Sequence, residues 1–345
     1  MKGHGREEQK RVQRAAELDR PPPVPSQARH MRPRGPRPLA MTLAVIAAAV
    51  SSVPVSALAA GEATEEAPRA VSFEIGSGVQ YDSNVAVLDL DTSANAGDAA
   101  ALLELGVGYD TPRSGPVGFQ AGYNFSQSLH EDFDEFDVGI HRGSASVSLD
   151  LEKLDTGAML QYARASLDGE EFLVLTQVSP YVSKLVGQKL FLRFAYAYSD
   201  KEFATNPGRA ARADSVSADT FVFLNGLETY LVLGVRYDEE DAIDGQFDYT
   251  GHKLRAQLSR RIALGARRLT LKAQLRYETR DYERPTLSIG APRNDDRYQF
   301  EATAELPIGE RVVTAIGYKY ADNRSNLSSV DFEENVIAVR FIAGW

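Results

Sequence analysis

The last fifteen residues of the chain, 331–345, constrain its fold more than any other segment. One face of this segment would carry Asn335, Ile337, Val339, Phe341, Ala343 and Trp345. Alternation with a period of two residues is the pattern of a β-strand whose two faces meet different surroundings. A water-soluble domain seldom ends on an exposed Trp. The apolar face is therefore expected to meet lipid, with the aromatic residue at the membrane–water boundary.

The same period recurs after residue 70, in runs of about ten residues separated by turn-forming residues. The clearest runs are 190–198, 231–237, 269–277 and 298–306. Strands are predicted near 70–83, 99–110, 116–128, 136–151, 156–167, 171–185, 188–199, 217–226, 229–238, 249–262, 267–279, 297–306, 311–321 and 332–345. The fold class predicted is therefore all-β, a transmembrane up-and-down antiparallel β-barrel of about 14 strands. A phase change near Gly143 predicts a β-bulge there.

The connections between these strands alternate in length. Those after even-numbered strands are short, and several after odd-numbered strands are long, namely 84–98, 200–216, 239–248, 280–296 and 322–331. Outer-membrane barrels have short periplasmic turns and long extracellular loops, so both termini are expected in the periplasm. A soluble β-sandwich or a lipocalin-like barrel would explain the strand alternation. It would not explain the loop asymmetry, the terminal aromatic residue and an export signal together.

An export signal is predicted near the N-terminus. Arg32, Arg34 and Arg37 precede an apolar run at 39–50, and 57–59 offers a small-residue cleavage site. The run is shorter than the roughly twenty residues of a membrane helix. Residues 1–30 are polar and Pro-rich, which predicts either translation from Met31 or an unusually long basic region. The domains expected are thus a signal at 1–59, a short periplasmic lead at 60–69 and the barrel at 70–345.

Charge and composition exclude some functions. The first 59 residues hold ten Lys/Arg and four Asp/Glu, so their removal would take the formal net charge from −10 to −16. A chain this acidic is a poor candidate for nucleic-acid binding. The chain has no Cys, which excludes disulfides and thiolate metal sites and suits a barrel closed by strand pairing.

Charged residues on the polar strand faces are expected to line the lumen. The candidates for a selectivity zone are Arg193, Arg236, Lys253, Arg255, Lys272, Arg276, Glu301, Glu305 and Arg340. Five of the cations lie on three successive strands and could form a basic wall that favours anionic solutes, since charge rings set ion selectivity. Alternatively, the cations pair with Glu301, Glu305 and their neighbours and brace a closed lumen. The sequence leaves both open.

Neither a metal site nor an enzyme is predicted. Acidic clusters at 131–137 and 238–244 could hold Ca²⁺, but their spacing matches no calcium loop, and a solvated rim that bridges cations to lipid is the alternative. His130, His141 and His252 are the histidines after residue 60, and no nucleophile elbow, paired zinc histidines or phosphate loop is present. No cofactor is expected.

Two segments resemble known barrel families. The strand at 331–345 resembles the C-terminal strand of Gram-negative outer-membrane proteins, which implies that Phe341 and Trp345 are read by the barrel-assembly machinery. The run Tyr81, Asp82, Ser83 and Asn84 resembles the opening strand of two groups: proteobacterial porins encoded beside exopolysaccharide genes, and the C-terminal barrel of surface lipoprotein assembly modifiers. The modifiers commonly carry helical repeats before the barrel, whereas only 61–70 separates the expected signal from the first strand here.

The function predicted is a porin-like channel in the outer membrane of a Gram-negative bacterium. Small hydrophilic solutes would diffuse through a polar lumen narrowed by inward-folded loops. Fourteen strands lie between filled eight-stranded barrels and open porins of 16 to 18 strands, which favours a modest or plugged pore. The alternatives are a conduit for an exopolysaccharide or a surface lipoprotein, and a non-conducting structural or adhesive barrel. Outer-membrane lipid and the barrel-assembly machinery are the expected partners.

Overall fold

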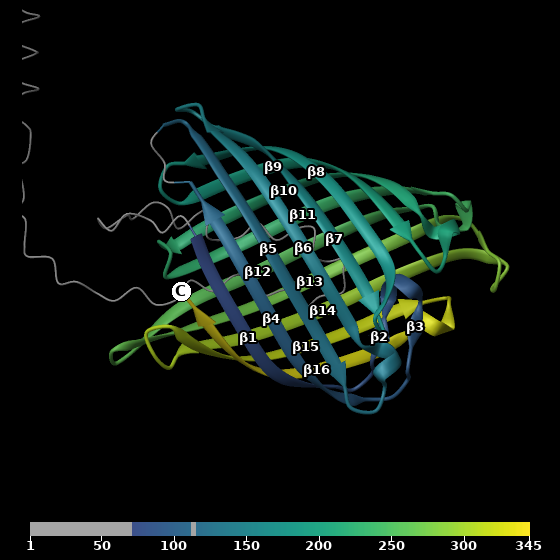
Figure 1. Ribbon diagram of the computed structural model, residues 1–345. Coiled ribbons are helices and arrows are strands. Elements are labelled where there is room, and N and C mark those ends of the chain that lie inside the picture. The colour runs from purple at the N-terminus through teal and green to yellow at the C-terminus, as the bar shows by residue number, and fades with distance from the viewer. Residues whose placement is uncertain (1–70, 112–114) are drawn as a thin grey trace, which may run out of the picture. The chain divides into compact units, whose positions relative to one another are not determined.

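Fourteen antiparallel strands close into one barrel, and β1 pairs with β16 to complete it (Figure 1). The computed structural model describes residues 71–111 and 115–345, so the predicted signal and periplasmic lead lie outside the described residues. The barrel strands are β1 (Val71–Asp82), β4 (Asp98–Asp110), β5 (Val117–His130), β6 (Val138–Asp150), β7 (Asp155–Leu167), β8 (Glu170–Val186), β9 (Leu190–Phe203), β10 (Ala211–Asn225), β11 (Thr229–Ala242), β12 (Tyr249–Leu264), β13 (Arg267–Thr286), β14 (Ala291–Pro307), β15 (Val312–Ser325) and β16 (Phe332–Gly344). The predicted fold class and strand number are confirmed.

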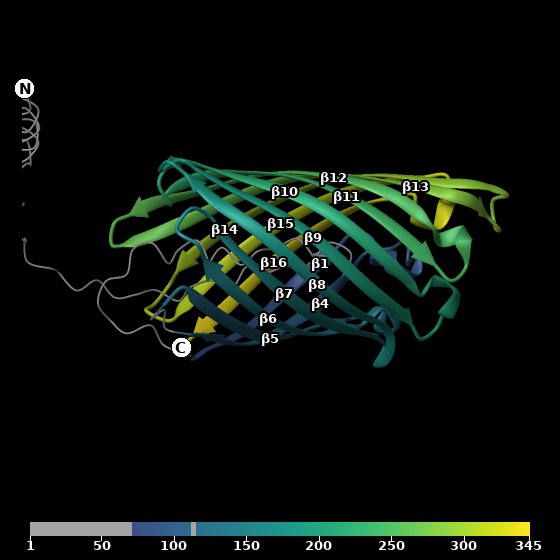
Figure 2. The ribbon, with the colours of Figure 1, turned by 90° about the horizontal axis from the view of Figure 1, so that it is seen from above.

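The two ends of the barrel differ. The turn end carries the C-terminal Trp345 and connections such as 187–189, 226–228 and 265–266. The opposite loop end carries the long connection 83–97 and four short 3-10 turns, and the strands run obliquely between the two ends (Figures 1 and 2). None of the helical segments in the described residues has the length and hydropathy needed to cross a membrane.

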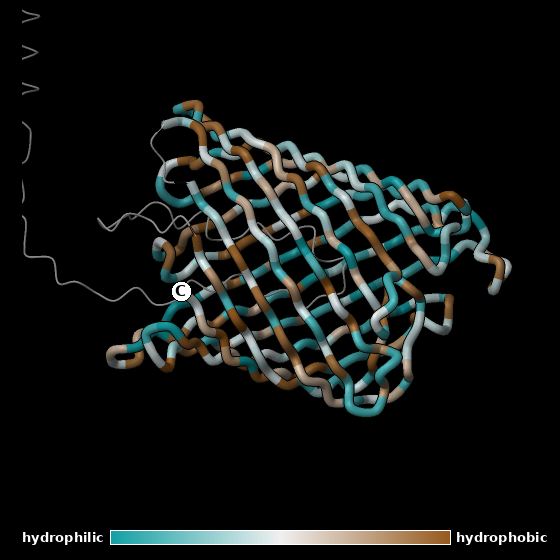
Figure 3. The backbone as a smooth tube through the Cα atoms, viewed as in Figure 1, coloured by the Kyte–Doolittle hydropathy of each residue, from teal (hydrophilic) through white to brown (hydrophobic). Residues whose placement is uncertain are grey.

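The pairing register of the strands aligns inward residues with inward residues, and outward with outward, around the barrel wall. Paired residues share a face, so Arg276 lies beside Arg255 and Gln299 on the inside, whereas Tyr277 lies beside Leu254 and Tyr298 on the outside. Hydrophobic and hydrophilic residues therefore alternate along the strands in Figure 3. The outer face is apolar and exposed, with large side chains on nearly every strand. A continuous exposed apolar surface of this extent suits lipid rather than water.

At the loop end the strands extend past this apolar face. On β13, outward Leu275 and Tyr277 are followed by outward Thr279, Asp281 and Glu283. The predicted link 84–98 is confirmed at 83–97, but the other four predicted long links were too long, because their flanks continue the strands: the observed connections are 204–210, 243–248, 287–290 and 326–331. Above the membrane the outward positions become polar. The apolar alternation that marks a membrane strand then disappears although strand pairing continues.

The predicted bulge near Gly143 was wrong. Strand β6 pairs with β5 and β7 without a register shift, and shifts occur instead next to Ala165, Phe223 and Asp281. The hydropathy phase changes for another reason. Ile140 faces the interior and packs against an apolar cluster, while His141 faces outward and its ring nitrogen is 2.7 Å from the Tyr123 hydroxyl.

The connection 83–97 contributes Val85 and Val87 to that apolar cluster; it folds into the loop end of the barrel and is called the inner loop below. It contains β2 (Ala86–Val87), η4 (Leu88–Leu90) and β3 (Thr92–Ser93). Val85 and Val87 are buried against inward side chains of the wall, including Leu173, Leu175 and Phe203. The lumen is thus narrowed by an inward-folded loop, as expected, and its position in the chain is now defined.

Candidate functional site: the lumen wall and the inner loop

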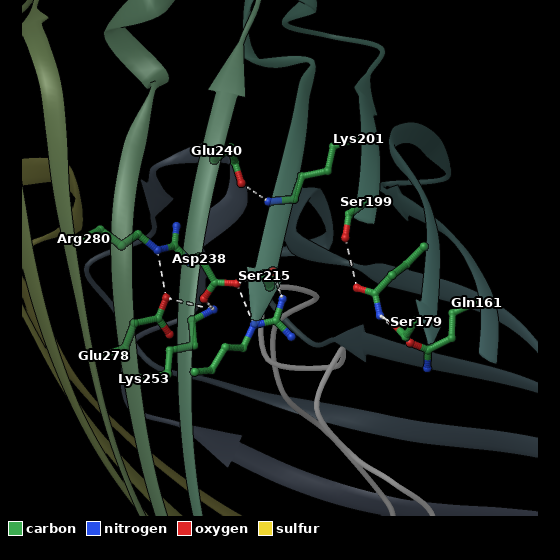
Figure 4. Close-up of polar contacts among 12 residues, drawn as sticks. Gln161, Ser179, Ser199, Lys201, Ser215, Asp238, Glu240, Lys253, Glu278 and Arg280 are labelled. Carbon is green, nitrogen blue, oxygen red and sulfur yellow. Dashed lines mark hydrogen bonds and ion pairs between the residues drawn. The ribbon is translucent and has the colours of Figure 1, made fainter. Parts of the chain in front are cut away.

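A chain of alternating charges crosses three strands of the inner wall (Figure 4). Arg236 Nε donates to Asp238 Oδ1 at 2.6 Å, and Lys253 Nζ lies 3.5 Å from Asp238 Oδ2. Lys253 also lies 3.3 Å from Glu278 Oε1, which accepts from Arg280 Nε at 2.8 Å. Each cation thus touches at least one carboxylate from its own or a neighbouring strand, so this part of the wall is ionic but nearly neutral.

The remaining lumen candidates divide into paired and unpaired groups. Arg255 Nη2 donates to Asp219 Oδ1 at 2.8 Å, and Lys272 Nζ donates to Glu305 Oε1 at 2.6 Å. Glu301 accepts from Gln299 Nε2 at 2.7 Å. The contacts of two arginines are with neutral groups.

The first of these arginines, Arg276, donates to Gln299 Oε1 at 3.2 Å. The guanidinium carbon of the second, Arg193, lies 4.2 Å from the centre of the Tyr181 ring. The five cations of the predicted basic wall therefore do not form a surface of one sign.

Sequence reasoning missed three acidic partners in this network: Asp219, Asp238 and Glu278. Asp238 and Glu240 were assigned to an acidic loop cluster, but both lie on β11 and face the interior, where Glu240 pairs with Lys201. Hydropathy could not identify these residues as part of a strand, because an acidic residue that faces inward just above the apolar face has the same polarity as a loop residue.

A neutral polar wall adjoins the ionic one on β7–β9 (Figure 4). Gln177 is 1% exposed, and its Nε2 donates to Gln161 Oε1 at 3.1 Å and to Ser179 Oγ at 2.8 Å. Ser199 Oγ donates to Gln177 Oε1 at 3.0 Å. The hydrogen-bonding capacity of this amide is largely used internally, so it stabilises the wall rather than offering a free group to a solute.

The seam between β1 and β16 is crossed by an ion pair. Arg340 on β16 reaches over β1 to Glu104 on β4, with 3.8 Å between Arg340 Nε and Glu104 Oε1. Two glycines of β1 make this possible. A Cβ at Gly78 would lie 2.9 Å from Arg340 Cγ, and one at Gly76 would lie 3.2 Å from Glu104 Cβ. Small residues here let two long side chains meet above the first strand.

The inner loop is held by one carboxylate between two arginines. Asp91 Oδ1 lies 3.0 Å from Arg293 Nη1 of β14, and Asp91 Oδ2 lies 2.9 Å from Arg209 Nη2 of η6 (Pro207–Arg209). Asp91 follows η4 with a φ of 53°, a left-handed conformation that Asp tolerates better than most residues. Arg293 also donates to Asp295 at 2.7 Å. The carboxylate thus connects the tip of the loop to two well-separated parts of the barrel.

The motif 81–84 forms the base of the inner loop. Asp82 Oδ1 accepts from the Asn84 backbone at 2.9 Å, and Ser83 Oγ accepts from the Asn335 backbone of β16 at 2.8 Å. Asn84 Oδ1 accepts from Ser93 Oγ at 2.7 Å. Tyr81 faces outward. The motif therefore ends β1, joins it to β16 and starts the inward turn.

The proposed assembly residues and the histidines are also placed. Phe341 and Trp345 face outward on the lipid side, 50% and 43% exposed. His130 Nδ1 lies 3.3 Å from Asp137 Oδ1. Over residues 71–111 and 115–345, no three His, Asp or Glu side chains converge as a metal-binding group.

The sequence profile of one protein family matches residues 130–343, described as "surface lipoprotein assembly modifier". The chain belongs to this family. The match covers β6 to β16, so the shared part of this assembly modifier is the barrel wall itself, and the inner loop lies before the matched residues. No curated protein sequence matches the chain.

Several solved structures share the barrel architecture at low identity. The match to an anion-selective porin from Comamonas acidovorans spans 80% of this chain and 98% of the porin chain, at 10% sequence identity and a TM-score of 0.47. The match to a loop-deletion mutant of OmpT of Vibrio cholerae spans 80% of this chain and 99% of the OmpT chain, at 8% sequence identity and a TM-score of 0.48. The match to OpdK of Pseudomonas aeruginosa, solved with vanillate, spans 80% of this chain and 99% of the OpdK chain, at 11% sequence identity and a TM-score of 0.43.

The location of this assembly modifier follows from its family and its surface. A closed barrel with an exposed apolar outer face belongs in a bilayer, and the family is described by surface lipoprotein assembly. The protein is an outer-membrane protein of a Gram-negative bacterium. Since such barrels place short turns in the periplasm, the loop end is the extracellular end.

Proposed function

We propose that the barrel is an outer-membrane conduit for surface lipoprotein assembly and that the inner loop is its gate. The observation that carries this proposal is the family match, because it falls on the transmembrane barrel rather than on an accessory segment. The polar inner wall supplies a path that a hydrophilic polypeptide segment can share with water. The role is non-enzymatic: the wall holds, orients and admits its cargo.

The gating part of the proposal rests on how the inner loop is attached. Its apolar side packs on Leu173 and Leu175, and its tip is held by the two salt bridges of Asp91. The two ends of the loop already lie together, since Ala94 N donates to Val85 O at 2.8 Å and Val85 N donates to Ala96 O at 3.0 Å. The loop can therefore leave the lumen without changing where β1 ends and β4 begins.

Surface delivery in the native host tests this function. We expect deletion of the gene to reduce the protease-accessible fraction of one or more lipoproteins on intact cells, while their total amounts stay constant. Wild-type protein should restore that fraction. A variant in which Gly-Gly replaces 86–93 should also restore delivery but leave the membrane permeable to large antibiotics, because the gate is missing. Unchanged surface exposure of every lipoprotein in the deletion strain would contradict the proposal.

Passive passage of small anions is a second candidate, and Arg193 and Arg276 favour it. Their contacts are with the Tyr181 ring and Gln299, so within residues 71–111 and 115–345 no bonded carboxylate matches their positive charges. We expect single channels of the full chain in planar bilayers to prefer anions. Arg276→Gln should shift the reversal potential toward zero, and the double variant Lys272→Gln with Glu305→Gln, which removes an ion pair of zero net charge, should shift it less. A cation preference in the wild-type channel would exclude this candidate.

A further inference from the structure

A cavity lies at the loop end, beside the inner loop. Arg280 and Arg297 line it from β13 and β14, Asn323 lines it from β15, and Leu88 of the inner loop and Val330 of η8 (Ser328–Val330) line it from the loops. It contains about 390 Å³ of space not filled by protein, part of it open to solvent. The enclosed part of this space has room for a few waters or one carboxyl group, so the rest of a bound segment would lie along the open mouth.

Polar atoms in this cavity lack partners. Asn323 is 6% exposed, yet neither its Nδ2 nor its Oδ1 has a hydrogen-bond partner in the part of the chain that the structure describes. The neighbouring Arg297 Nε is buried and has none either. Buried donors and acceptors are almost always paired, and an unpaired one costs roughly 1–3 kcal/mol. Two adjacent unpaired side chains thus indicate a place for a ligand.

The charges around the cavity select the sign of that ligand. Arg280 is bonded to Glu278, and Arg293 is bonded to both Asp295 and Asp91. Those guanidinium charges are compensated by fixed carboxylates. The Arg297 guanidinium has no bonded carboxylate among the described residues, and its cross-strand neighbour Glu278 acts on it only at longer range. Asp296, which also lines the cavity, already accepts from the Tyr277 hydroxyl. A bound anion would therefore supply the short-range contact that Arg297 lacks.

The amide of Asn323 selects the kind of ligand. It offers a donor and an acceptor side by side, which matches the carbonyl and N–H of a peptide backbone. A sugar would favour open aromatic faces for stacking. The two nearby rings are already in cation–π contacts. The guanidinium carbon of Arg293 lies 4.7 Å from the centre of the Tyr282 ring, and that of Arg280 lies 5.0 Å from the centre of the Tyr249 ring. The two ring centres are 5.4 Å apart.

We propose that this cavity is a binding subsite for an extended acidic peptide segment. A side-chain carboxylate accepts from Arg297 Nε and Asn323 Nδ2, and a backbone N–H of the same segment donates to Asn323 Oδ1. This inference rests on the proposed handling of polypeptide cargo and names the sequence chemistry of the segment held at the extracellular mouth. The overall charge of the chain is negative, so an acidic segment gains nothing from the protein's long-range field and depends on these local donors.

Peptide binding to the purified full chain in detergent tests the proposal. The probes are fluorescein-labelled peptides of alternating Glu and Ser, alternating Gln and Ser, and alternating Lys and Ser, eight residues each, followed by fluorescence anisotropy. We expect the Glu peptide to bind at least tenfold more tightly than the Gln peptide. Arg297→Gln and Asn323→Ala should each weaken it at least fivefold. The matched control Arg284→Gln, an exposed arginine at the same end of β13, should change it less than twofold.

A charge-reversing variant keeps the test decisive if a truncation misfolds. Asn323→Asp preserves the side-chain size, and it should weaken the Glu peptide and strengthen the Lys peptide. Heat-modifiable gel mobility checks that each variant is a closed barrel. Equal affinity for the Glu and Gln peptides, or tight Glu-peptide binding that ignores both substitutions, would overturn the proposal. Oligogalacturonate binding that depends on Asn323, with no peptide binding, would overturn it in favour of an acidic sugar. These results leave the surface-delivery experiment unaffected, so the two proposals fail separately.

Discussion

Replacing Asp91 with Asn should loosen the inner loop by an amount that can be measured. The carboxylate bonds Arg209 and Arg293, and all three side chains are mostly buried, with 16%, 12% and 5% exposed. Asparagine keeps the size of the side chain but removes its charge. A hydrogen bond between charged groups contributes about 1.5–3 kcal/mol.

The net loss is smaller than the sum of two such bonds. Arg293 keeps its bonds to Asp295, and the partial exposure of Asp91 and Arg209 allows water to replace some of the interaction. We therefore expect about 2 kcal/mol of destabilisation of the closed loop, which corresponds to about a 30-fold larger open population. The apolar contacts of Val85 and Val87 remain, so the loop should stay mostly closed.

A chain without cysteine makes this population accessible to thiol labelling. Val87 is 7% exposed in the closed loop, so the labelling rate of Val87→Cys by a polar maleimide reports how often the loop opens. We expect the rate to rise about 30-fold when Asp91→Asn is added. Asp241→Asn, an exposed carboxylate on β11, should leave the rate within twofold. A labelling rate that rises less than threefold with Asp91→Asn would refute the reasoning, because the salt bridges would then not hold the loop.

Two further outcomes concern the barrel itself. Gly78→Ala should lower its stability by about 1–3 kcal/mol, the usual cost of overpacking, because a Cβ there would clash with the carbonyl oxygen of Val339. Gly143→Ala is the matched control, since nothing lies within 4 Å of a Cβ at that position, and equal urea midpoints in lipid vesicles would contradict the prediction. Phe341→Ala with Trp345→Ala should reduce the fraction of heat-modifiable barrel in cells but not refolding in detergent; unchanged assembly would remove their role as an assembly signal.

The barrel could be predicted from the sequence because lipid imposes a simple rule on its strands. Outward side chains between the two membrane surfaces are apolar, so the alternation in a run such as 269–277 shows which of its residues face lipid. Where β13 leaves the membrane at Thr279, that rule ends while strand pairing continues to Thr286. The strand ends at the loop end therefore could not be found from hydropathy.

The partners within the lumen could not be predicted for a different reason. Arg255 of β12 lies directly beside Arg276 of β13 in the strand register, yet it bonds Asp219 of β10, which is two strands from β12 on the side away from Arg276. Such diagonal contacts depend on strand stagger, which the alternation of one strand does not reveal. The inner loop did leave a signal that was not used: Val85 and Val87 are β-branched apolar residues in a stretch otherwise assigned to solvent.

The apolar cluster at the loop end argues for a gate rather than a permanently narrowed channel. Val85 and Val87 cover Leu173 and Leu175, which face inward together with other apolar residues of the wall such as Phe203. In a permanently open channel, apolar residues at that position would face water and contribute nothing. Their burial stabilises the closed loop by about 1.5–3 kcal/mol for each fully buried valine. That energy is large enough to keep the mouth closed at rest. It is also small enough to be exceeded if cargo replaces the loop's contacts with the same wall, so the proposed conduit would open without an external energy source.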